Sequence, residues 1–513
     1  MDVLLISLNR EAEPFTAAPL GMALVAGSLV GAGHRVRSVD LLFSDDPRAE
    51  IIQSFDGFRP GLVGISIRNI ESSTEFLLPS YRDAVSVIKS VSDAPIAAGG
   101  PGFSILPEQA LSYLGLELGI AGEGERAILE LVSALETGQD PSGVPGVCVL
   151  RAGVFAHTPS ALLEGPDLVQ GPSWDGLPMT GYDMVGVQSK RGCSFNCIYC
   201  TYPSLEGRRL RLREPSLVAA EMEASSSAGA SAFYFVDNVF NNPPSHARAV
   251  CDAIKARGID LSWGALVSPN GLDGGLVDAM AGSGCGSVEI GADSLSDRML
   301  KNLGKSFRAA DVRSAVSTCK ITGLMHMVFL ILGGPGEDYD TLMETFDAVD
   351  SLSPDKVFAV SGVRVYPGTP LARIAEAEGV IGPDDPLLMP VFYTSDRLGD
   401  RLYTLSEEFF GAHPGWLYYP AKGVTGDKPK QQAGLSWGAD AMDCFEKVMV
   451  CVPLLLRPIA RKAVHRKAGS LALERGRASV TTAEVRDAFL SETPAPFKAG
   501  MRESLKGLGL IDG

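Results

Sequence analysis

The sequence has few of the features that mark a membrane, secreted or nucleic-acid-binding protein. Its longest apolar run, near residues 449–457, is broken by Pro453 and falls far short of a membrane-spanning helix. Its first residues lack the basic start, apolar stretch and small-residue cleavage site of a secretory signal, so we expect a cytoplasmic protein. The net charge of −16 disfavours nucleic acid as a partner, because phosphate binding depends on clustered positive charge.

Ligand sets for the common metals are also scarce. The six histidines are dispersed without the spacing of metal ligands, and six of the nine cysteines are scattered, mostly in apolar settings. Cytosolic cysteines of this kind are usually reduced and buried. We therefore expect core positions for Cys148, Cys251, Cys285, Cys319, Cys444 and Cys451.

At 513 residues the chain is long enough for three domains. Residues 1–145 alternate short β-branched apolar runs with amphipathic helices, which predicts a doubly wound, Rossmann-like α/β domain. Residues 146–180 predict a hairpin turning at Ala152-Gly153 and then a linker rich in Pro and Gly. Six further strand patterns separated by helices predict a partial (β/α)6 barrel within residues 181–400. Beyond about 400 the strand pattern stops, so residues 401–513 should form a small helical C-terminal domain.

The segment "RGCSFNCIYC" places Cys193, Cys197 and Cys200 in a C-x3-C-x2-C pattern after the first predicted barrel strand. Structural zinc needs four Cys or His ligands, usually as two separated pairs, and no second pair exists. A redox C-x2-C motif leaves Cys193 unexplained, and core cysteines do not suit a loop that contains Gly and Asn. The spacing suits a [4Fe-4S] cluster whose fourth iron is left for a non-protein ligand.

This pattern, with Tyr199 before the last cysteine, resembles the radical S-adenosylmethionine (SAM) superfamily, in which SAM chelates the open iron. Later segments strengthen the resemblance because they follow in the same order: "FVDNVF" (235–240), "VEIGADS" (288–294), "LILGGPGED" (330–338) and "YPGTPL" (366–371). One departure is visible, since "DN" at 237 and 238 replaces the Gly-Gly-Glu commonest in the superfamily.

The resemblance implies five SAM contacts. Tyr199 would pack near the adenine, Asp237 and Asn238 lie in the segment that meets the amino group, Glu289 would approach the ribose or methionine portion, and Gly334 belongs to the adenine segment. Taken singly, Asp237 could instead cap a helix, Glu289 could pair within the barrel and the glycines could form a turn.

The first domain resembles the cobalamin-binding domain that precedes the barrel in cobalamin-dependent members. The resemblance rests on "GISIRN" (64–69), "AAGGPGFS" (97–104) and "GIAGEGE" (119–125), and with the barrel motifs it covers roughly residues 1–375. It implies a cobalamin outside the carboxyl ends of the strands. The implied contacts are Ser66, Arg68, Gly99, Gly100, Gly102 and Glu123, with the glycines allowing close backbone approach.

The alternative for this domain is a doubly wound unit that binds nothing, or a nucleotide. No G-x-G-x-x-G follows the first strand, which disfavours a dinucleotide. Many cobalamin proteins have D-x-H-x-x-G at that point, whereas residues 9–21 here contain no histidine. We therefore expect a cobalt that is not ligated by a histidine of that motif.

Taken together, the resemblances imply a cobalamin-dependent radical SAM methyltransferase acting on an unactivated carbon of a small molecule, as in natural-product or antibiotic biosynthesis. Its cofactors would be a [4Fe-4S] cluster, SAM and methylcobalamin, with a flavodoxin- or ferredoxin-type electron donor. A cyclase or ring-rearranging enzyme of tetrapyrrole or secondary metabolism and a non-catalytic cobalamin carrier or sensor stay open as alternatives.

Two architectural expectations follow from the methyltransferase interpretation. The two large domains should face one shared cavity, because radical and methyl donor act on the same atom. The C-terminal helices, which resemble a module of protochlorophyllide-reductase-type proteins, are expected to cover the active site as a lid.

Overall fold

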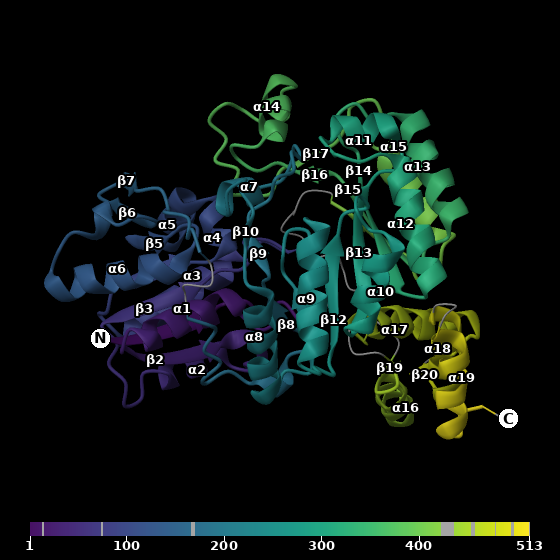
Figure 1. The fold of residues 1–513 in the computed structure, drawn as a ribbon, viewed down its shortest axis with the longest axis horizontal. Helices are drawn as coiled ribbons and strands as arrows, with labels where there is room; N and C mark the ends of the chain where they lie inside the picture. The colour runs from purple at the N-terminus through teal and green to yellow at the C-terminus, as the bar shows by residue number, and fades with distance from the viewer. Residues whose placement is uncertain are drawn as a thin grey trace.

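Two large, mainly parallel sheets with their helices and a small helical domain make up the described part of the protein (Figure 1). The computed structural model describes residues 1–513 except 13–14, 73–74, 166–169, 422–435, 453–456, 478, 494–496 and 512–513.

The first sheet has the strand order β2-β1-β3-β4-β5-β6-β7. The first five strands in the chain are parallel, and the hairpin predicted at Ala152-Gly153 is present and extends the sheet in antiparallel fashion. The strands are β1 (Asp2–Ser7), β2 (Arg35–Asp40), β3 (Leu62–Ser66), β4 (Ile96–Gly99), β5 (Leu118–Ile120), β6 (Val147–Arg151) and β7 (Val154–His157). The order reverses between β1 and β3, and a ligand crevice is expected at such a switch point.

Helices cover both faces of the first sheet, as predicted. Alternate residues of β1 point to opposite faces: Val3 and Leu5 pack with α1 and α6, whereas Leu4 and Ile6 pack with the helices of the other face. The helices are α1 (Leu20–Gly31), α2 (Pro47–Gln53), α3 (Leu78–Val91), α4 (Pro101–Ile105), α5 (Pro107–Leu114) and α6 (Gly124–Thr137).

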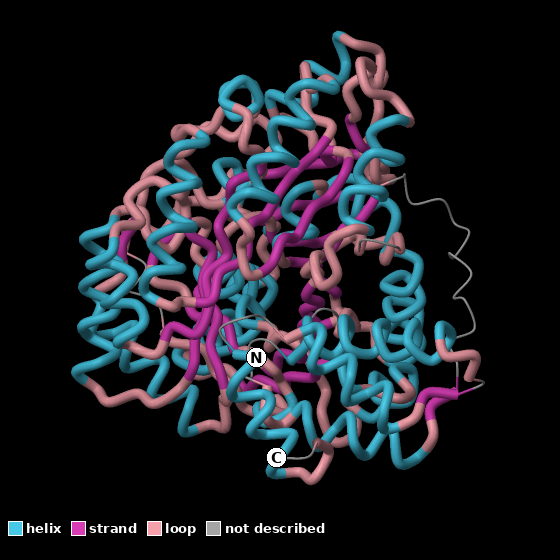
Figure 2. The backbone as a smooth tube through the Cα atoms, turned by 90° about the vertical axis from the view of Figure 1, so that its right-hand side faces the viewer, coloured by secondary structure: helices cyan, strands magenta, loops and turns pink. Residues whose placement is uncertain are grey.

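The second sheet is an open, curved layer of parallel strands in the order β18-β15-β14-β13-β12-β11-β8 (Figure 2). All six predicted barrel strands are present: β8 (Val185–Val187), β11 (Ala232–Phe235), β12 (Ser262–Val267), β13 (Cys285–Asp293), β14 (Met325–Leu332) and β15 (Lys356–Ser361). The prediction that strands stop near residue 400 is wrong, because β18 (Leu417–Pro420) pairs in parallel with β15. This strand is short and lies at the sheet edge, where its terminal proline is tolerated.

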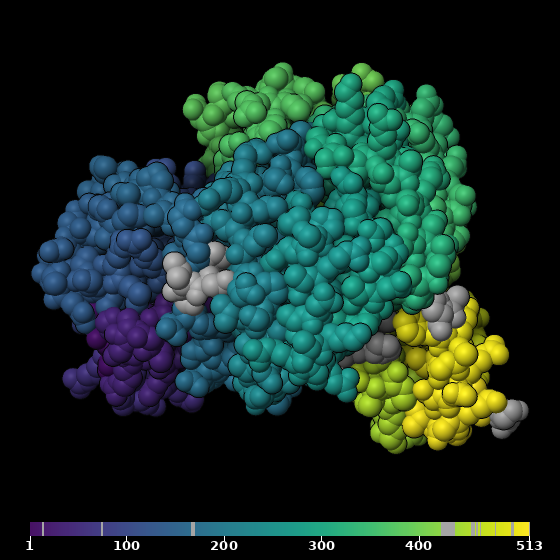
Figure 3. All heavy atoms as spheres, viewed as in Figure 1, coloured from purple at the N-terminus to yellow at the C-terminus, as the bar shows by residue number. Residues whose placement is uncertain are grey.

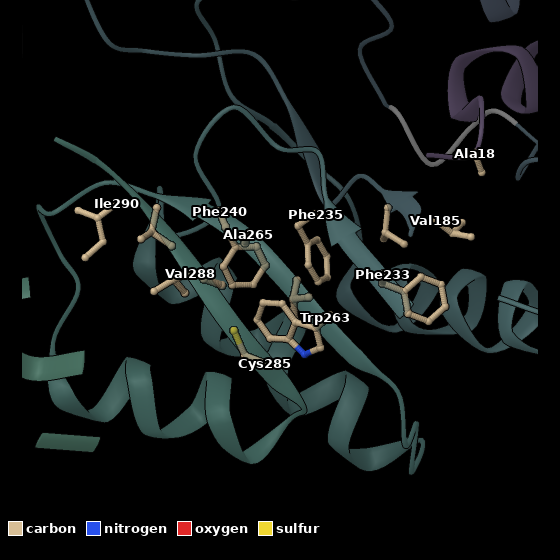
Figure 4. Packing of buried hydrophobic residues seen from close by; sticks show 14 of the residues in the cluster. Ala18, Val185, Phe233, Phe235, Phe240, Trp263, Ala265, Cys285, Val288 and Ile290 are labelled. Carbon is tan, nitrogen blue, oxygen red and sulfur yellow. The ribbon is translucent and has the colours of Figure 1, made fainter. Parts of the chain in front are cut away.

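Helices of the second layer alternate with these strands, and the core between them is aromatic. Trp263 is fully buried, and its ring lies 5.1 Å from the rings of both Phe235 and Phe240 (Figure 4). The helices are α8 (Pro215–Ser227), α9 (Pro244–Ala256), α10 (Gly274–Gly282), α11 (Asp297–Asn302), α12 (Ala309–Thr322), α13 (Tyr339–Leu352), α14 (Pro370–Ala377) and α15 (Arg401–Gly411).

The C-terminal domain lies at one end of the barrel part of the chain (Figure 3), and its contacts with β14 and β15 are at the amino ends of these strands. It comprises α16 (Ala439–Met449), α17 (Arg457–Glu474), α18 (Thr482–Glu492), α19 (Lys498–Gly507) and the short pair β19 (Ser436–Trp437) and β20 (Ser479–Val480). Its core includes Met325, the first residue of β14. The Nζ of Lys356, the first residue of β15, donates to the carbonyls of Gly415 (3.1 Å) and Glu492 (3.4 Å).

The lid predicted for these helices is therefore wrong. They contact the amino ends of β14 and β15, whereas the cysteine loop follows the carboxyl end of β8. No helix in the described part of the chain has the length and apolarity that crossing a bilayer requires.

Candidate active site

The three-cysteine loop lies between the two sheets and is closed at its base by a short antiparallel pair, β9 (Lys190–Arg191) and β10 (Arg211–Leu212) (Figure 1). Gly192 begins the loop at φ 91°, and a Cβ there would lie 2.2 Å from the carbonyl oxygen of Arg209, so the turn requires glycine. The backbone N–H of Cys200 donates to the carbonyl of Cys197 at 3.3 Å. The loop is thus folded back on itself and not extended.

The three thiols form one electrostatic group. Burial raises the pKa of Cys193, Cys197 and Cys200, the last to about 11, and each added negative charge on one thiol opposes ionisation of its neighbours. All three are free, and Lys305 Nζ lies 3.9 Å from Cys197 Sγ. Among the described residues, no set of three Cys, His, Asp or Glu side chains is arranged to hold a single metal ion.

Tyr199 belongs to a buried polar group behind the loop. Its hydroxyl donates to Asp293, and Lys305 Nζ lies 2.7 Å from Asp293 Oδ2 and 3.3 Å from the Tyr199 oxygen. Asp293 ends β13 with φ 65°, an uncommon conformation for a residue other than glycine. The segment after α11 holds the loop in place, because the N–H of Ile198 donates to the carbonyl of Leu303.

Asp237 and Asn238 follow β11 and contact both ends of the loop base. The Asp237 carboxylate is completely buried and accepts from the N–H groups of Ser189 (2.7 Å) and Lys190 (3.2 Å) and from Lys190 Nζ (2.8 Å). Asn238 donates through Nδ2 to Glu206 at 2.8 Å, while its Oδ1 is buried without a partner. Glu206 also accepts from the N–H of Gly192 at 3.0 Å.

The two remaining SAM candidates lie on neighbouring strands. Glu289 on β13 accepts a 2.7 Å hydrogen bond from the hydroxyl of Tyr234 on β11, and burial raises the pKa of Glu289. Gly334 lies in the turn after β14, where its N–H donates to Glu337 Oε2 at 3.2 Å. Glu337 is fully buried, its Oε1 has no partner, and burial raises its pKa to about 7.

A cavity of about 660 Å³ lies at the carboxyl edge of the first sheet and extends to the second. Its walls include Met184, Tyr202, Tyr234 and Tyr366 from the barrel part of the chain, so the predicted shared cavity is confirmed. All six residues predicted for cobalamin line it, namely Ser66, Arg68, Gly99, Gly100, Gly102 and Glu123. None of the described lining residues is a histidine.

At two of these positions glycine is required for a different physical reason from the predicted one. A Cβ on Gly100 would lie 2.5 Å from the carbonyl oxygen of Ile67, and one on Gly102 would lie 2.9 Å from that of Arg68. These glycines therefore let the loop after β4 pass against the loop after β3, within the protein. A Cβ on Gly99 would have only the carbonyl oxygen of Ile120 near it, at 3.7 Å. Gly21, at the start of α1, lines the cavity, and a Cβ added there would have no protein atom within 4 Å.

Sequence reasoning missed several lining residues. Asn9 follows β1, is 4% exposed and has a buried Oδ1 without a partner. Its position directly after the first strand could have predicted a role in ligand binding, because ligands bind at the carboxyl edge of such sheets. Tyr202, Glu206 and Tyr366 gave no such signal, since their contribution depends on how the two sheets meet.

Two family models match the chain. The Radical SAM superfamily model matches residues 187–349, and the B12 binding domain model matches residues 11–132. The chain thus contains a radical SAM domain and a B12-binding domain, and its homologues are cobalamin-dependent radical SAM methyltransferases. The two domains imply a [4Fe-4S] cluster, SAM and cobalamin as cofactors.

Curated relatives span most of the chain. An uncharacterized methyltransferase of Pyrococcus horikoshii is 29% identical over 75% of this chain and 86% of its own length. The tryptophan 2-C-methyltransferase of Streptomyces laurentii is 26% identical over 72% of this chain and 74% of its own. An anaerobic magnesium-protoporphyrin IX monomethyl ester cyclase of Rubrivivax gelatinosus is 22% identical over 81% and 77%.

Solved structures share the fold. The radical SAM methyltransferase TsrM of Kitasatospora setae, with cobalamin and a [4Fe-4S] cluster bound, superposes with a TM-score of 0.74 at 22% identity, covering 92% of this chain and 99% of TsrM. The cobalamin-dependent radical enzyme OxsB gives 0.69 at 14% identity over all of this chain and 81% of OxsB.

The residues present fit these cofactors. Three thiols on one loop, that of Cys193 buried and those of Cys197 and Cys200 partly buried, are the donor set of a cluster with one open iron, and metal binding would displace their protons. The cavity lies at the switch point of a doubly wound sheet, and the unpartnered Oδ1 of Asn9 is a buried acceptor that only a ligand or water can satisfy.

The raised pKa of Glu337 predicts a pH-dependent stability. Between its ordinary pKa of 4.5 and about 7, the folded state holds a proton that the unfolded state releases, so the free energy of unfolding falls as pH rises through that window. Glu337→Gln should remove this component, which amounts to about 3 kcal/mol at most. Urea denaturation of both proteins across the window measures it, with the exposed Glu344→Gln as control. A constant difference between wild type and Glu337→Gln would contradict the prediction.

The open position at Gly21 predicts a selective block of the cavity. Gly21→Leu adds a side chain whose Cβ meets no atom of the protein within 4 Å, at a position that lines the cavity, so we expect folding to persist while retention of hydroxocobalamin is lost. Absorbance of bound cobalamin after gel filtration measures retention. Gly282→Leu in α10 is the matched control, because its Cβ also meets nothing within 4 Å. Equal retention by both variants would place the corrin elsewhere.

Proposed function

We propose that this enzyme transfers a methyl group to an unactivated carbon of a small molecule in natural-product biosynthesis. The observation that carries the proposal is the single cavity lined by both Ser66 of the B12-binding domain and Tyr202, which lies two residues after Cys200. A methyl donor on one wall and a radical source beside the other would then reach the same substrate atom.

On the barrel side, Cys193, Cys197 and Cys200 would hold the cluster. The buried, unpartnered Oδ1 of Asn238 supports a contact with the SAM amino group, because it is an acceptor facing no protein donor. Asp237 already accepts hydrogen bonds from Ser189 and Lys190, so its role in our proposal is to hold the start of the loop.

Tyr199, Glu289 and Gly334 stay predicted SAM contacts. The Tyr199 hydroxyl is held by Asp293, which leaves the ring as the part available for packing. Glu289 shares its carboxylate with Tyr234, a residue that itself lines the cavity, so a contact there would reach SAM and substrate together.

On the other wall, Ser66, Arg68, Gly99 and Asn9 are the proposed cobalamin contacts. The Arg68 guanidinium is partly buried, and burial lowers its pKa although the charges of Glu11 and Asp40 act in the opposite direction. A partly buried cation gains from further polar partners, and the corrin's amide groups offer carbonyl acceptors.

When bound, the cluster with SAM supplies radical chemistry and cobalamin supplies the methyl group. The chain contributes enclosure and orientation. Ile65, Ile70 and Val236 line the cavity together with Tyr202 and Tyr234, and apolar walls of this kind would limit the access of water to the space where a carbon radical forms.

The relatives support our proposal for the substrate class. The similar Streptomyces enzymes are a tryptophan 2-C-methyltransferase and a cytidylyl-2-hydroxyethylphosphonate methyltransferase, both acting on small molecules. We propose a small-molecule substrate of the same biosynthetic type, with electrons delivered by a flavodoxin- or ferredoxin-type protein.

Removal of the three thiols tests the cluster. Anaerobically reconstituted enzyme should carry about four irons, and the Ala variant of Cys193, Cys197 and Cys200 should lose them together with charge-transfer absorption and SAM cleavage. Iron analysis and absorption spectra measure this. The core position predicted for Cys451 is wrong, because this residue is exposed in the C-terminal domain, and Cys451→Ala therefore serves as control. A triple variant that kept both iron and SAM cleavage would refute the assignment.

Isotope labelling tests the reaction. With SAM carrying a trideuterated methyl group, each turnover should give one S-adenosylhomocysteine, one 5'-deoxyadenosine and a product in which the labelled methyl replaces one hydrogen. Mass spectrometry of all three decides the class. One similar protein, from Rubrivivax gelatinosus, is a cyclase, so a cyclase is the alternative to test. A cyclase would give 5'-deoxyadenosine without labelled product or matching S-adenosylhomocysteine. A carrier would give neither nucleoside.

A further inference from the structure

Four charged side chains meet in the interior where the B12-binding domain contacts the cysteine loop. Glu123 and Glu125 stand at the start of α6, and Arg191 and Arg211 belong to β9 and β10. Arg191 pairs with Glu125 and lies 3.5 Å from Glu123 Oε2, while Arg211 pairs with Glu123 Oε1. None of these side chains is more than 7% exposed. We call these four residues the ion cluster.

The ion cluster holds the base of the cysteine loop from both sides. Arg191 and Arg211 are opposite each other in the antiparallel pair that closes the loop, one immediately before and one shortly after the cysteines. Arg211 also donates to the backbone carbonyl of Glu206 at 2.7 Å, and the Glu206 side chain accepts from the N–H of Gly192. A shift of the B12-binding domain would therefore pull on the first and last residues of the loop together.

Such a cluster fixes the relative orientation of the segments that it joins more than it adds to the free energy of unfolding. Buried ion pairs gain little over apolar side chains of the same volume, because desolvation offsets their attraction, but their hydrogen bonds fix geometry. Glu123, Glu125 and Arg191 also line the cavity. The contacts thus join the wall of the cobalamin site directly to the strand that leads into the cluster ligands.

We propose that the ion cluster is a positioning site that fixes the three-cysteine loop relative to the cobalamin cavity, and thereby sets the distance between the two metal cofactors. The proposal rests on the proposed function for the occupants of the two sites. It assigns Glu123, which also lines the cavity, to holding the interface and not to recognising the corrin alone.

The test compares three variants in the reconstituted holoenzyme. The double variant Arg191→Met with Glu125→Leu removes the directional bonds while keeping apolar volume, and Arg191→Lys keeps the charge. The exposed pair Arg126→Met with Glu130→Leu on the same helix is the matched control. With the cluster reduced and cobalamin as cob(II)alamin, the paramagnetic relaxation of cob(II)alamin reports the distance between the centres.

The double variant should show a several-fold slower cob(II)alamin relaxation than wild type at unchanged iron and cobalamin content, Arg191→Lys an intermediate value, and the control no change. In the apoprotein, hydrogen exchange of residues 192–210 should be about tenfold faster in the double variant, as expected when a hydrogen bond of ordinary net strength is lost. Unchanged relaxation and exchange would overturn the proposal.

Hydrogen exchange decides between the outcomes in which the magnetic measurement on the two cofactors fails. If the double variant fails to bind a cofactor, faster exchange confined to residues 192–210 supports the proposal and unchanged exchange refutes it. If wild type itself shows no interaction between cob(II)alamin and the cluster, the proposed function fails, while the exchange result still decides whether the ion cluster holds the loop.

Discussion

One hydrophobic core extends without a break from the first sheet into the second, and the arrangement of the cofactor sites depends on it. Leu29 of α1 and Ile128 of α6 belong to the same buried cluster as Val185 of β8 and Phe233 of β11. The interface is also tied by the bond from the Tyr182 hydroxyl to Asp40 at 2.7 Å. Because the sheets share this core, their carboxyl edges face one cavity and cannot turn away from each other without exposing apolar surface.

The parts of the molecule that sequence patterns predicted are those fixed by local periodicity. Strands such as Asp2–Ser7 and Met325–Leu332 are apolar runs buried on both faces, and their order along the chain determines which loops share an edge. This is why strand patterns placed the loops after β3 and β4 at the ligand-binding edge. The resemblance to cobalamin-binding domains then singled out Ser66, Arg68 and Gly99, which line the cavity there. The spacing of the three cysteines is also a local pattern, so it could be recognised without knowing any contact between distant segments.

The parts that could not be predicted depend on contacts between distant segments. Lys305 reaches Asp293 and the cysteine loop only because Gly304 allows that segment to pass against Asn196, where a Cβ would lie 2.3 Å from the carbonyl oxygen. The pairing of Glu123 with Arg211 spans 88 residues of sequence. The position of the C-terminal domain likewise follows from single contacts such as that of Lys356, which no pattern within residues 401–513 reveals.

The attachment of the C-terminal domain to the amino ends of β14 and β15 separates it mechanically from the cavity. None of the described residues beyond 435 lines the cavity, which lies at the carboxyl edges of the sheets. Tyr366, in the segment that leads to α14, lines the cavity from that opposite end. A side-chain change at a described position of the C-terminal domain can therefore alter the surface of the molecule while every side chain that lines the cavity stays the same.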